Sequence, residues 1–156
     1  MKRIDVFESL VIQKHSLLLT ESYERVCGKP FPIAGSKRPL VEALYDSKFI
    51  LVSHGIEKDP IFNYANLAAQ SLWGMNWEIF TQLPSRLSAK ADKTEERGTA
   101  LEEALAKGYI SNYEGIRVDA SGKEFHIKNV TLWNMMDETG IQHGQAALFD
   151  QWHYVK

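Results

Sequence analysis

The spacing of hydrophobic residues near the N-terminus is that of a helix. Residues 5–27 carry apolar side chains three or four positions apart, and Gly28 and Pro30 end this pattern. The spacing predicts one amphipathic helix or two short ones, with Asp5 as the N-cap. Residues 28–38 are rich in Pro, Gly and Lys, and they predict a connecting loop.

Compact apolar or alternating runs further along the chain predict strands. Residues 49–54 and 61–65 form two such runs, which are close enough to pair as a hairpin. Three longer runs follow at residues 109–118, 123–136 and 144–154. Short segments with Asp, Gly and Ser or Thr separate these three runs, and they predict tight turns between antiparallel neighbours.

The middle of the chain predicts short helices instead. Residues 40–45 and 77–83 suit two of them, and a third fits between Asn66, as its cap, and Gly74. Residues 94–107 predict a longer helix. The order of elements predicts an α+β fold, with a five-stranded antiparallel sheet, short helices over one face and the N-terminal helix on the other.

Composition narrows the functional classes. The chain has 156 residues, a net charge of −2 and no basic run, so we expect a single domain that binds neither nucleic acid nor a membrane. The basic N-terminus has no apolar segment behind it, which argues against a signal peptide. The single cysteine, Cys27, cannot form an internal disulfide, and we expect a cytoplasmic protein.

Several short motifs occur in an order typical of one family. Residues 59–69 look like the PAS signature, in which the second strand runs into the first helix of the core. Further motifs are Pro84-Ser85-Arg86-Leu87-Ser88-Ala89, Gly115-Ile116-Arg117, Gly122-Lys123-Glu124-Phe125-His126-Ile127, Val130-Thr131-Leu132-Trp133-Asn134 and Gly144-Gln145-Ala146-Ala147-Leu148-Phe149. Together they resemble the MEKHLA domain family, whose PAS-like members occur as small bacterial proteins and at the C-terminus of plant class III homeodomain–leucine zipper transcription factors.

The resemblance covers about Tyr45 to Trp152, and more weakly the N-terminal helix. It implies an N-terminal helical extension and loop at residues 1–38 and a PAS-like domain at residues 39–156, in a stand-alone bacterial member. It also implies a role in sensing or protein interaction. DNA binding is not implied, because the chain has no homeodomain or zipper.

The predicted cup between sheet and helices is the candidate ligand site. Uninterrupted alternation along residues 123–136 places Phe125, Asn129 and Trp133 on its inner face. A buried polar side chain such as Asn129 needs an internal partner or a ligand, and Arg117 needs an anion, a carboxylate or an aromatic face. The predicted ligand-binding residues are Asn63, Tyr64, Trp73, Arg86, Tyr113, Arg117, Phe125, Asn129, Thr131, Trp133, Gln145 and Ala147.

The same alternation predicts an apolar outer face on the sheet. Such a face should meet the N-terminal helix of the same chain or a second subunit. The predicted interface residues are Phe7, Leu10, Val11, Leu18, Val130, Leu132, Leu148 and Trp152. A signal from the cup would then reach the helix through residues 123–136 and 144–154.

Three functions remain open. The first is a sensor of a small apolar or aromatic ligand, whose identity is unknown, acting as a homodimer or on a signalling protein. The second is a ligand-free homodimerisation module, and the third is a small isomerase, which needs an inward Asp or Glu that the pattern does not supply. No catalytic or metal-binding residues are predicted, since the five histidines are scattered. A reactive-cysteine flavin sensor needs a cysteine in the helical middle, and Cys27 lies outside it.

Overall fold

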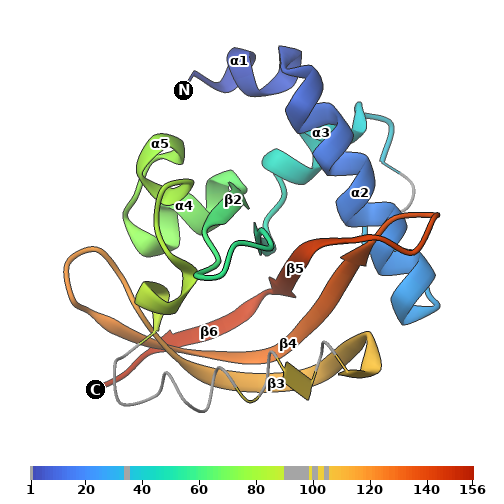
Figure 1. The fold of residues 1–156 in the computed structure, drawn as a ribbon. Helices are drawn as coiled ribbons and strands as arrows, with labels where there is room; N and C mark the ends of the chain where they lie inside the picture. The colour runs from blue at the N-terminus through green and yellow to red at the C-terminus, as the bar shows by residue number, and fades with distance from the viewer. Residues whose placement is uncertain (1, 34–35, 90–98, 100–101, 104–105) are drawn as a thin grey trace.

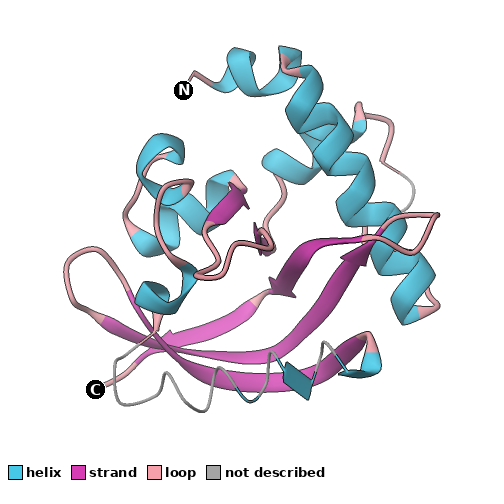
Figure 2. Cartoon of the chain, viewed as in Figure 1, coloured by secondary structure: helices cyan, strands magenta, loops and turns pink. Residues whose placement is uncertain are grey.

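The computed structural model describes residues 2–33, 36–89, 99, 102–103 and 106–156. Within them one sheet has six strands, all paired antiparallel, and its main path runs in the order β2-β1-β5-β4-β3 (Figures 1 and 2). The strands are β1 (Ile50–His54), β2 (Phe62–Ala65), β3 (Tyr109–Val118), β4 (Glu124–Met136), β5 (Gln142–Phe149) and β6 (Gln151–Tyr154). The predicted α+β class and antiparallel sheet are confirmed.

The last predicted strand is two strands. Its register breaks at Asp150, between β5 and β6. Strand β5 pairs with β1 and with the second half of β4, whereas β6 pairs only with the first half of β4. The long strand β4 therefore belongs to both halves of the sheet.

Helices cover both faces of the sheet. They are α1 (Arg3–Glu8), α2 (Leu10–Cys27), α3 (Leu40–Tyr45), α4 (Leu67–Trp73), α5 (Trp77–Phe80) and the 3-10 helix η1 (Ser85–Ser88). Helix α2 lies beside β4 and β5, while α4 and α5 lie beside β2, well apart from α2 (Figure 1). The predicted helix at residues 94–107 lies largely outside the described residues.

A separate hydrophobic cluster packs on each face of the sheet. What we call the cup cluster faces α4 and consists of Ile50, Val52, Phe62, Ala65, Ala69, Leu72, Trp73, Phe80, Phe125, Ile127, Val130, Leu132 and Phe149. The α2 cluster lies on the other side and consists of Val6, Ile12, Leu19, Tyr23, Phe31, Val41, Leu44, Tyr45, Leu51, Tyr64, Trp77, Trp133, Met135, Ala146 and Leu148. The N-terminal helix α2 therefore covers the face opposite α4, as predicted. The short helix α3 and Trp77 of α5 lie in the α2 cluster, so the prediction that all the short helices share the other face is wrong.

Local capping explains where the helices begin. The Ser9 side chain accepts a hydrogen bond from Ile12 N at 3.2 Å, which separates α1 from α2. Asp5 is not the N-cap that the sequence predicted, because it lies one turn inside α1 and accepts from Lys2 N. The predicted cap Asn66 is confirmed, since its Oδ1 accepts from Ala69 N at 3.1 Å. Its amide nitrogen also donates to Phe49 O at 2.9 Å, which ties α4 to the start of β1.

A β-bulge in β4 reverses the predicted alternation. Asn129 has a left-handed backbone with φ 54°, and the register shifts there, since Tyr113 pairs with Val130 but Gly115 pairs with Ile127. One extra residue in β4 moves every later side chain to the opposite face. The predicted single inner face is therefore wrong beyond Asn129.

The bulge changes the placement of the predicted residues. Phe125 lies in the cup, as predicted, but Asn129 is exposed and Trp133 belongs to the α2 cluster. Thr131 follows the alternation of Trp133 and also faces away from the cup. Conversely, Val130 and Leu132, predicted on the outer face, lie in the cup cluster.

The other predicted interface residues lie in three different environments. Leu148 is in the α2 cluster, and Phe7 and Leu18 pack against that cluster. Leu10 and Val11 are exposed, at 70% and 78%. Trp152 lies in β6, where 38% of it is exposed and its ring lies 6.0 Å from that of Phe125. The apolar face of the sheet is thus covered by the chain's own α2, while Leu10 and Val11 remain available to a partner.

The bulge gives a stability prediction. Asn129→Val should lower the free energy of unfolding by about 1–2 kcal/mol, because a branched side chain is strained in a left-handed backbone. Asn129→Gly, which suits that backbone, should change it little. Urea denaturation measures both, and equal stabilities for the two variants would contradict the bulge.

Candidate ligand cavity

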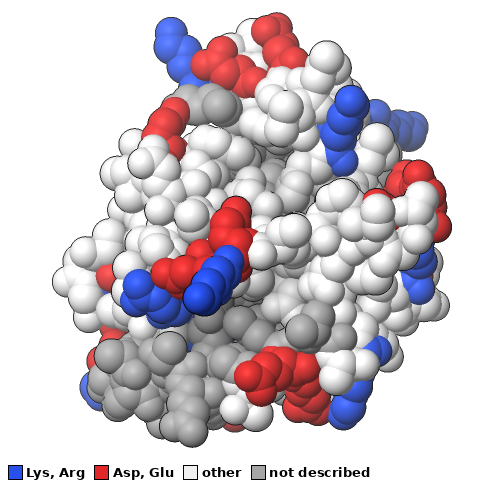
Figure 3. Space-filling view, viewed as in Figure 1, with Lys and Arg blue, Asp and Glu red and all other residues white. Residues whose placement is uncertain are grey.

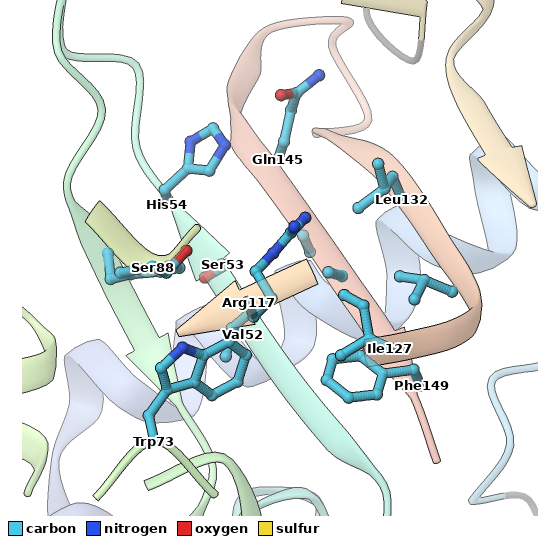
Figure 4. Close-up of a pocket in the computed structure, with 14 residues that line it drawn as sticks. Val52, Ser53, His54, Trp73, Ser88, Arg117, Ile127, Leu132, Gln145 and Phe149 are labelled. Carbon is cyan, nitrogen blue, oxygen red and sulfur yellow. The ribbon is translucent and has the colours of Figure 1, made fainter. Parts of the chain in front are cut away.

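A small cavity lies in the cup, between the inner face of the sheet and helices α4 and η1 (Figure 4). Its volume is about 40 Å³. Its apolar walls are Val52, Phe62, Trp73, Ile127, Val130, Leu132, Ala146, Ala147 and Phe149, and its polar lining residues are Ser53, His54, Ser88, Arg117 and Gln145. A concave, mostly apolar space with a few polar groups is the usual form of a small-molecule site.

Among the described residues that line the cavity, Arg117 is the only Lys, Arg, Asp or Glu. It is 7% exposed, and its guanidinium donates to Tyr113 Oη at 3.2 Å and to Ile116 O at 3.0 Å. No ion pair to Arg117 is present in the described part of the chain. Its guanidinium carbon lies 5.6 Å from the centroid of the Tyr113 ring, so the aromatic face that the sequence allowed as a partner is present. A buried cation without a carboxylate is still unfavourable, because buried charges are normally paired.

Gly115 leaves the room in which Arg117 and Tyr113 meet. A Cβ at this position would lie 2.8 Å from Tyr113 Oη and 3.1 Å from Arg117 Nη1. The three residues alternate along β3 on one face, as the sequence predicted. The tyrosine hydroxyl therefore fixes the guanidinium along the strand, directly above the glycine.

Trp73 contributes a second unused donor. The residue is 2% exposed, and its ring packs edge-on against Phe125 at 5.1 Å and Phe80 at 5.5 Å. Its Nε1–H has no hydrogen-bond acceptor among the described residues. Leaving such a donor unsatisfied costs roughly 1–3 kcal/mol.

His54 and Gln145 form a polar end to the cavity. They are register partners on β1 and β5, and the Gln145 amide donates to Asn134 Oδ1 at 2.9 Å. Both also line a neighbouring surface hollow of about 220 Å³. The strands approach closely here because of Gly144, where a Cβ would lie 1.9 Å from His54 O.

The structure brings together only some of the predicted ligand-binding residues. Trp73, Arg117, Gln145 and Ala147 line the cavity, and Tyr113 and Phe125 lie beside it in the cup. Asn63 and Arg86 are exposed, and Arg86 forms a surface ion pair with Asp59. Tyr64 joins Trp133 in the α2 cluster. A role in ligand binding remains a prediction for those that face the cavity.

Sequence reasoning missed part of the lining. Val130 and Leu132 were placed on the wrong face because the bulge was not foreseen. His54 was interpreted only as the end of a strand, although the alternation of residues 50–54 places it with Val52. Alternation in β1 was therefore an unused signal, whereas nothing in the sequence marks Ser88 as a lining residue.

Behind β1, a polar chain links the sheet to α2. Ser53 Oγ donates to Asn63 Oδ1 at 2.5 Å, and His15 Nε2 on α2 lies 2.8 Å from the same hydroxyl. The His15 ring stacks on Tyr64 at 5.7 Å. Burial, with a smaller contribution from His143, lowers the pKa of His15 to about 4. Neutral His15 therefore donates to Ser53, the residue between the cavity-lining Val52 and His54.

Comparison with known proteins identifies the fold. The family model described as "MEKHLA domain" matches residues 13–154. A PAS domain from Colwellia psychrerythraea is similar, with 14% identity and a TM-score of 0.62 over 73% of this chain and 92% of that one. A light-oxygen-voltage domain studied with a flavin analogue has 15% identity and a TM-score of 0.60 over 77% and 87%. A search of curated proteins gives no match.

A PAS domain from a two-component sensor histidine kinase is also similar, with 12% identity and a TM-score of 0.55 over 72% of this chain and 89% of that one. Identities this low establish the shared fold and nothing further. No described helix has the length and apolar character needed to cross a membrane. On the face shown in Figure 3, acidic and basic side chains are interspersed among the described residues.

The residues around the cavity do not fit a flavin. The cavity of about 40 Å³ is far smaller than the roughly 300–1,000 Å³ of pockets for drug-sized ligands. The chain's single cysteine, Cys27, ends α2 and packs against the α2 cluster. Burial raises the pKa of its thiol to about 11, which also makes it a poor nucleophile.

His15 gives a prediction for pH. Its pKa is 6.5 in the unfolded chain and about 4 in the fold, so the unfolded chain binds a proton more readily between these values. Stability due to His15 is therefore present above pH 6.5 and falls by about 1 kcal/mol per pH unit as the pH drops through this window. Chemical denaturation at pH 7.5, 6 and 5 should show a weaker pH dependence for His15→Gln than for the wild type. The exposed His153→Gln is the control, and an unchanged dependence in His15→Gln would contradict the assignment.

Proposed function

The chain belongs to the MEKHLA domain family, and on that basis we propose that it is a sensory module that binds a small ligand in the cavity and transmits binding to α2. The PAS-like fold supports a sensory role at the level of the domain. The observation that carries the proposal is Arg117, a buried cation that faces an apolar cavity and has no carboxylate partner in the described residues. Stability alone does not account for such a residue, because an apolar side chain of similar length would avoid the desolvation of the charge.

Strand β4 supplies one route from the cavity to α2. Leu132 lines the cavity, while its neighbour Trp133 projects to the other face. Trp133 Nε1 donates to Ser22 Oγ on α2 at 3.0 Å, and its ring meets that of Tyr23 at 5.0 Å. Protein interiors are close-packed, so a ligand that displaces Leu132 also displaces the residues that hold α2.

Strand β1 supplies a second route. Val52 and His54 line the cavity, and Ser53 between them meets His15 on α2. The two routes reach α2 at different points, His15 in its N-terminal half and Ser22 in its C-terminal half. A ligand can therefore change the position of the whole helix rather than fray one end of it.

Exposed apolar residues favour a second candidate function. Ile4, Leu10, Val11 and Leu17 on α1 and α2 are between 48% and 78% exposed. Large exposed apolar side chains on neighbouring elements are typical of interaction surfaces. A homodimerisation module acting through α1 and α2, rather than through the sheet, is thus the alternative. The isomerase alternative is not proposed, because none of the described residues that line the cavity is Asp or Glu.

Native mass spectrometry of the purified full chain tests ligand binding. The wild type should carry an additional mass that is released on denaturation. Ala147→Leu fills the cavity and should remove that mass, whereas the exposed Ala106→Leu should retain it. A wild-type mass equal to that of the chain alone, together with no melting shift in a small-molecule screen, would contradict the proposal.

Light scattering after gel filtration tests the alternative. Val11→Glu places a charge in the exposed apolar group and should convert a dimer to a monomer with little loss of stability. Ile56→Glu is the matched control, because Ile56 is 71% exposed and lies in the β1–β2 connection. A wild-type monomer, or a dimer that both substitutions leave intact, would exclude this surface as the interface.

A further inference from the structure

Resting on the proposed function, we infer that the ligand of the cavity is a small carboxylate with a short apolar tail, held by Arg117. The carboxylate of this ligand meets the guanidinium, and its tail meets the apolar walls of the cavity.

The unused polar groups of Arg117 and Trp73 are all donors. A guanidinium has five N–H groups, and that of Arg117 makes two hydrogen bonds in the described part of the chain. The indole Nε1–H of Trp73 makes none there. The remaining N–H groups of Arg117 need acceptors. The Tyr113 ring, whose centroid lies 5.6 Å from the guanidinium carbon, offers the cation an aromatic face, and an anion compensates the charge fully. A carboxylate supplies both the acceptors and the charge, because its two oxygens match the paired N–H groups of an arginine.

Arg117 is held ready for such a ligand. Its guanidinium lies against the Tyr113 hydroxyl at 3.2 Å, over the space that Gly115 leaves open. The long side chain runs from β3 into the middle of the cup, toward Gln145 (Figure 4). Holding a flexible side chain in its binding geometry before the ligand arrives lowers the entropy lost on binding. Tyr113 is accordingly a positioning residue for Arg117.

The size and walls of the cavity define the rest of the ligand. A volume of about 40 Å³ holds about three waters, equivalent to roughly 90 Å³ of liquid, which suits an acid of three or four carbons. Val52, Ile127 and Leu132 are among its apolar walls. An apolar tail gains from contact with such walls, whereas phosphate would leave most of its oxygens without donors.

Thermal melting of the full chain tests the inference. Sodium propionate and butyrate should raise the melting temperature in a saturable way, by roughly 5–10 °C at a hundred times the dissociation constant. Propionamide and butyramide match them in shape without the charge and should have little effect. Sodium chloride and phosphate at equal ionic strength control for salt, and stabilisation by these alone would overturn the inference.

Substitutions assign the response to Arg117. Arg117→Met keeps the length of the side chain but removes its charge, and it should abolish the shift while leaving a cooperative transition. Arg117→Lys should weaken binding at least tenfold, because the ammonium cannot form the paired contact. Tyr113→Phe should weaken binding several-fold, since the guanidinium loses its support. An equal response in wild type and Arg117→Met would overturn the inference.

The indole N–H signals in a ¹H–¹⁵N spectrum give a second readout that does not depend on stability. The carboxylate should shift the Trp73 signal and leave that of the partly exposed Trp152 in place. A native mass spectrum with a neutral bound molecule, combined with no response to carboxylates, would refute the inference and leave the proposed function standing. No bound molecule and no response to carboxylates would refute both.

Discussion

The extra residue at Asn129 in β4 decides which side chains meet the cavity and which meet α2. Its left-handed backbone interrupts the pairing of β3 and β4, so the strand's side chains change faces there. Phe125 and Ile127 before the bulge and Val130 and Leu132 after it all face the cup. Trp133 and Met135 are thereby directed to the opposite face, where they form the surface on which α2 packs.

The cavity and the α2 cluster are therefore built on the same strands, β1 and β4. Leu132 and Trp133 are neighbours on β4, one in the cavity wall and the other hydrogen-bonded to α2. On β1, His54 and Ser53 both line the cavity, and the Ser53 hydroxyl also meets His15 on α2. The wall of the cavity and the packing of α2 are thus connected through neighbouring residues on the same strands.

The elements of the fold could be predicted from the sequence because local signals agree with them. Turn residues separate β3, β4 and β5, and Asn66 is followed by an apolar segment of helical spacing, so both the antiparallel pairing of these three strands and the α4 cap were predictable. The pairing of β1 with β5 joins residues far apart in the sequence, and no local signal predicts it. Arg117 inside the cup was also anticipated, because β3 keeps its alternation from Tyr113 to Val118. The N-terminal helix could be predicted to cover one face of the sheet, because the helix and that face each carry apolar side chains.

The details of the site could not be predicted to the same degree. An asparagine adopts a left-handed backbone in many contexts but is also common in regular strands, so nothing in the sequence distinguishes Asn129 as a bulge. Assuming an unbroken strand placed Leu132 and Trp133 each on the wrong face. Because both side chains are apolar, the hydrophobic pattern is the same with and without the bulge. The break at Asp150 was missed for a similar reason, because residues on both sides of it have strand character.

We expect the cavity and α2 to be energetically coupled through β4. A double-mutant cycle between Leu132→Ala in the cavity wall and Ser22→Ala, which removes the partner of Trp133, measures this coupling by urea denaturation. Coupling through β4 predicts an interaction energy of about 0.5–1 kcal/mol, although the two side chains lie on opposite faces of the sheet. Additivity within about 0.3 kcal/mol would contradict it.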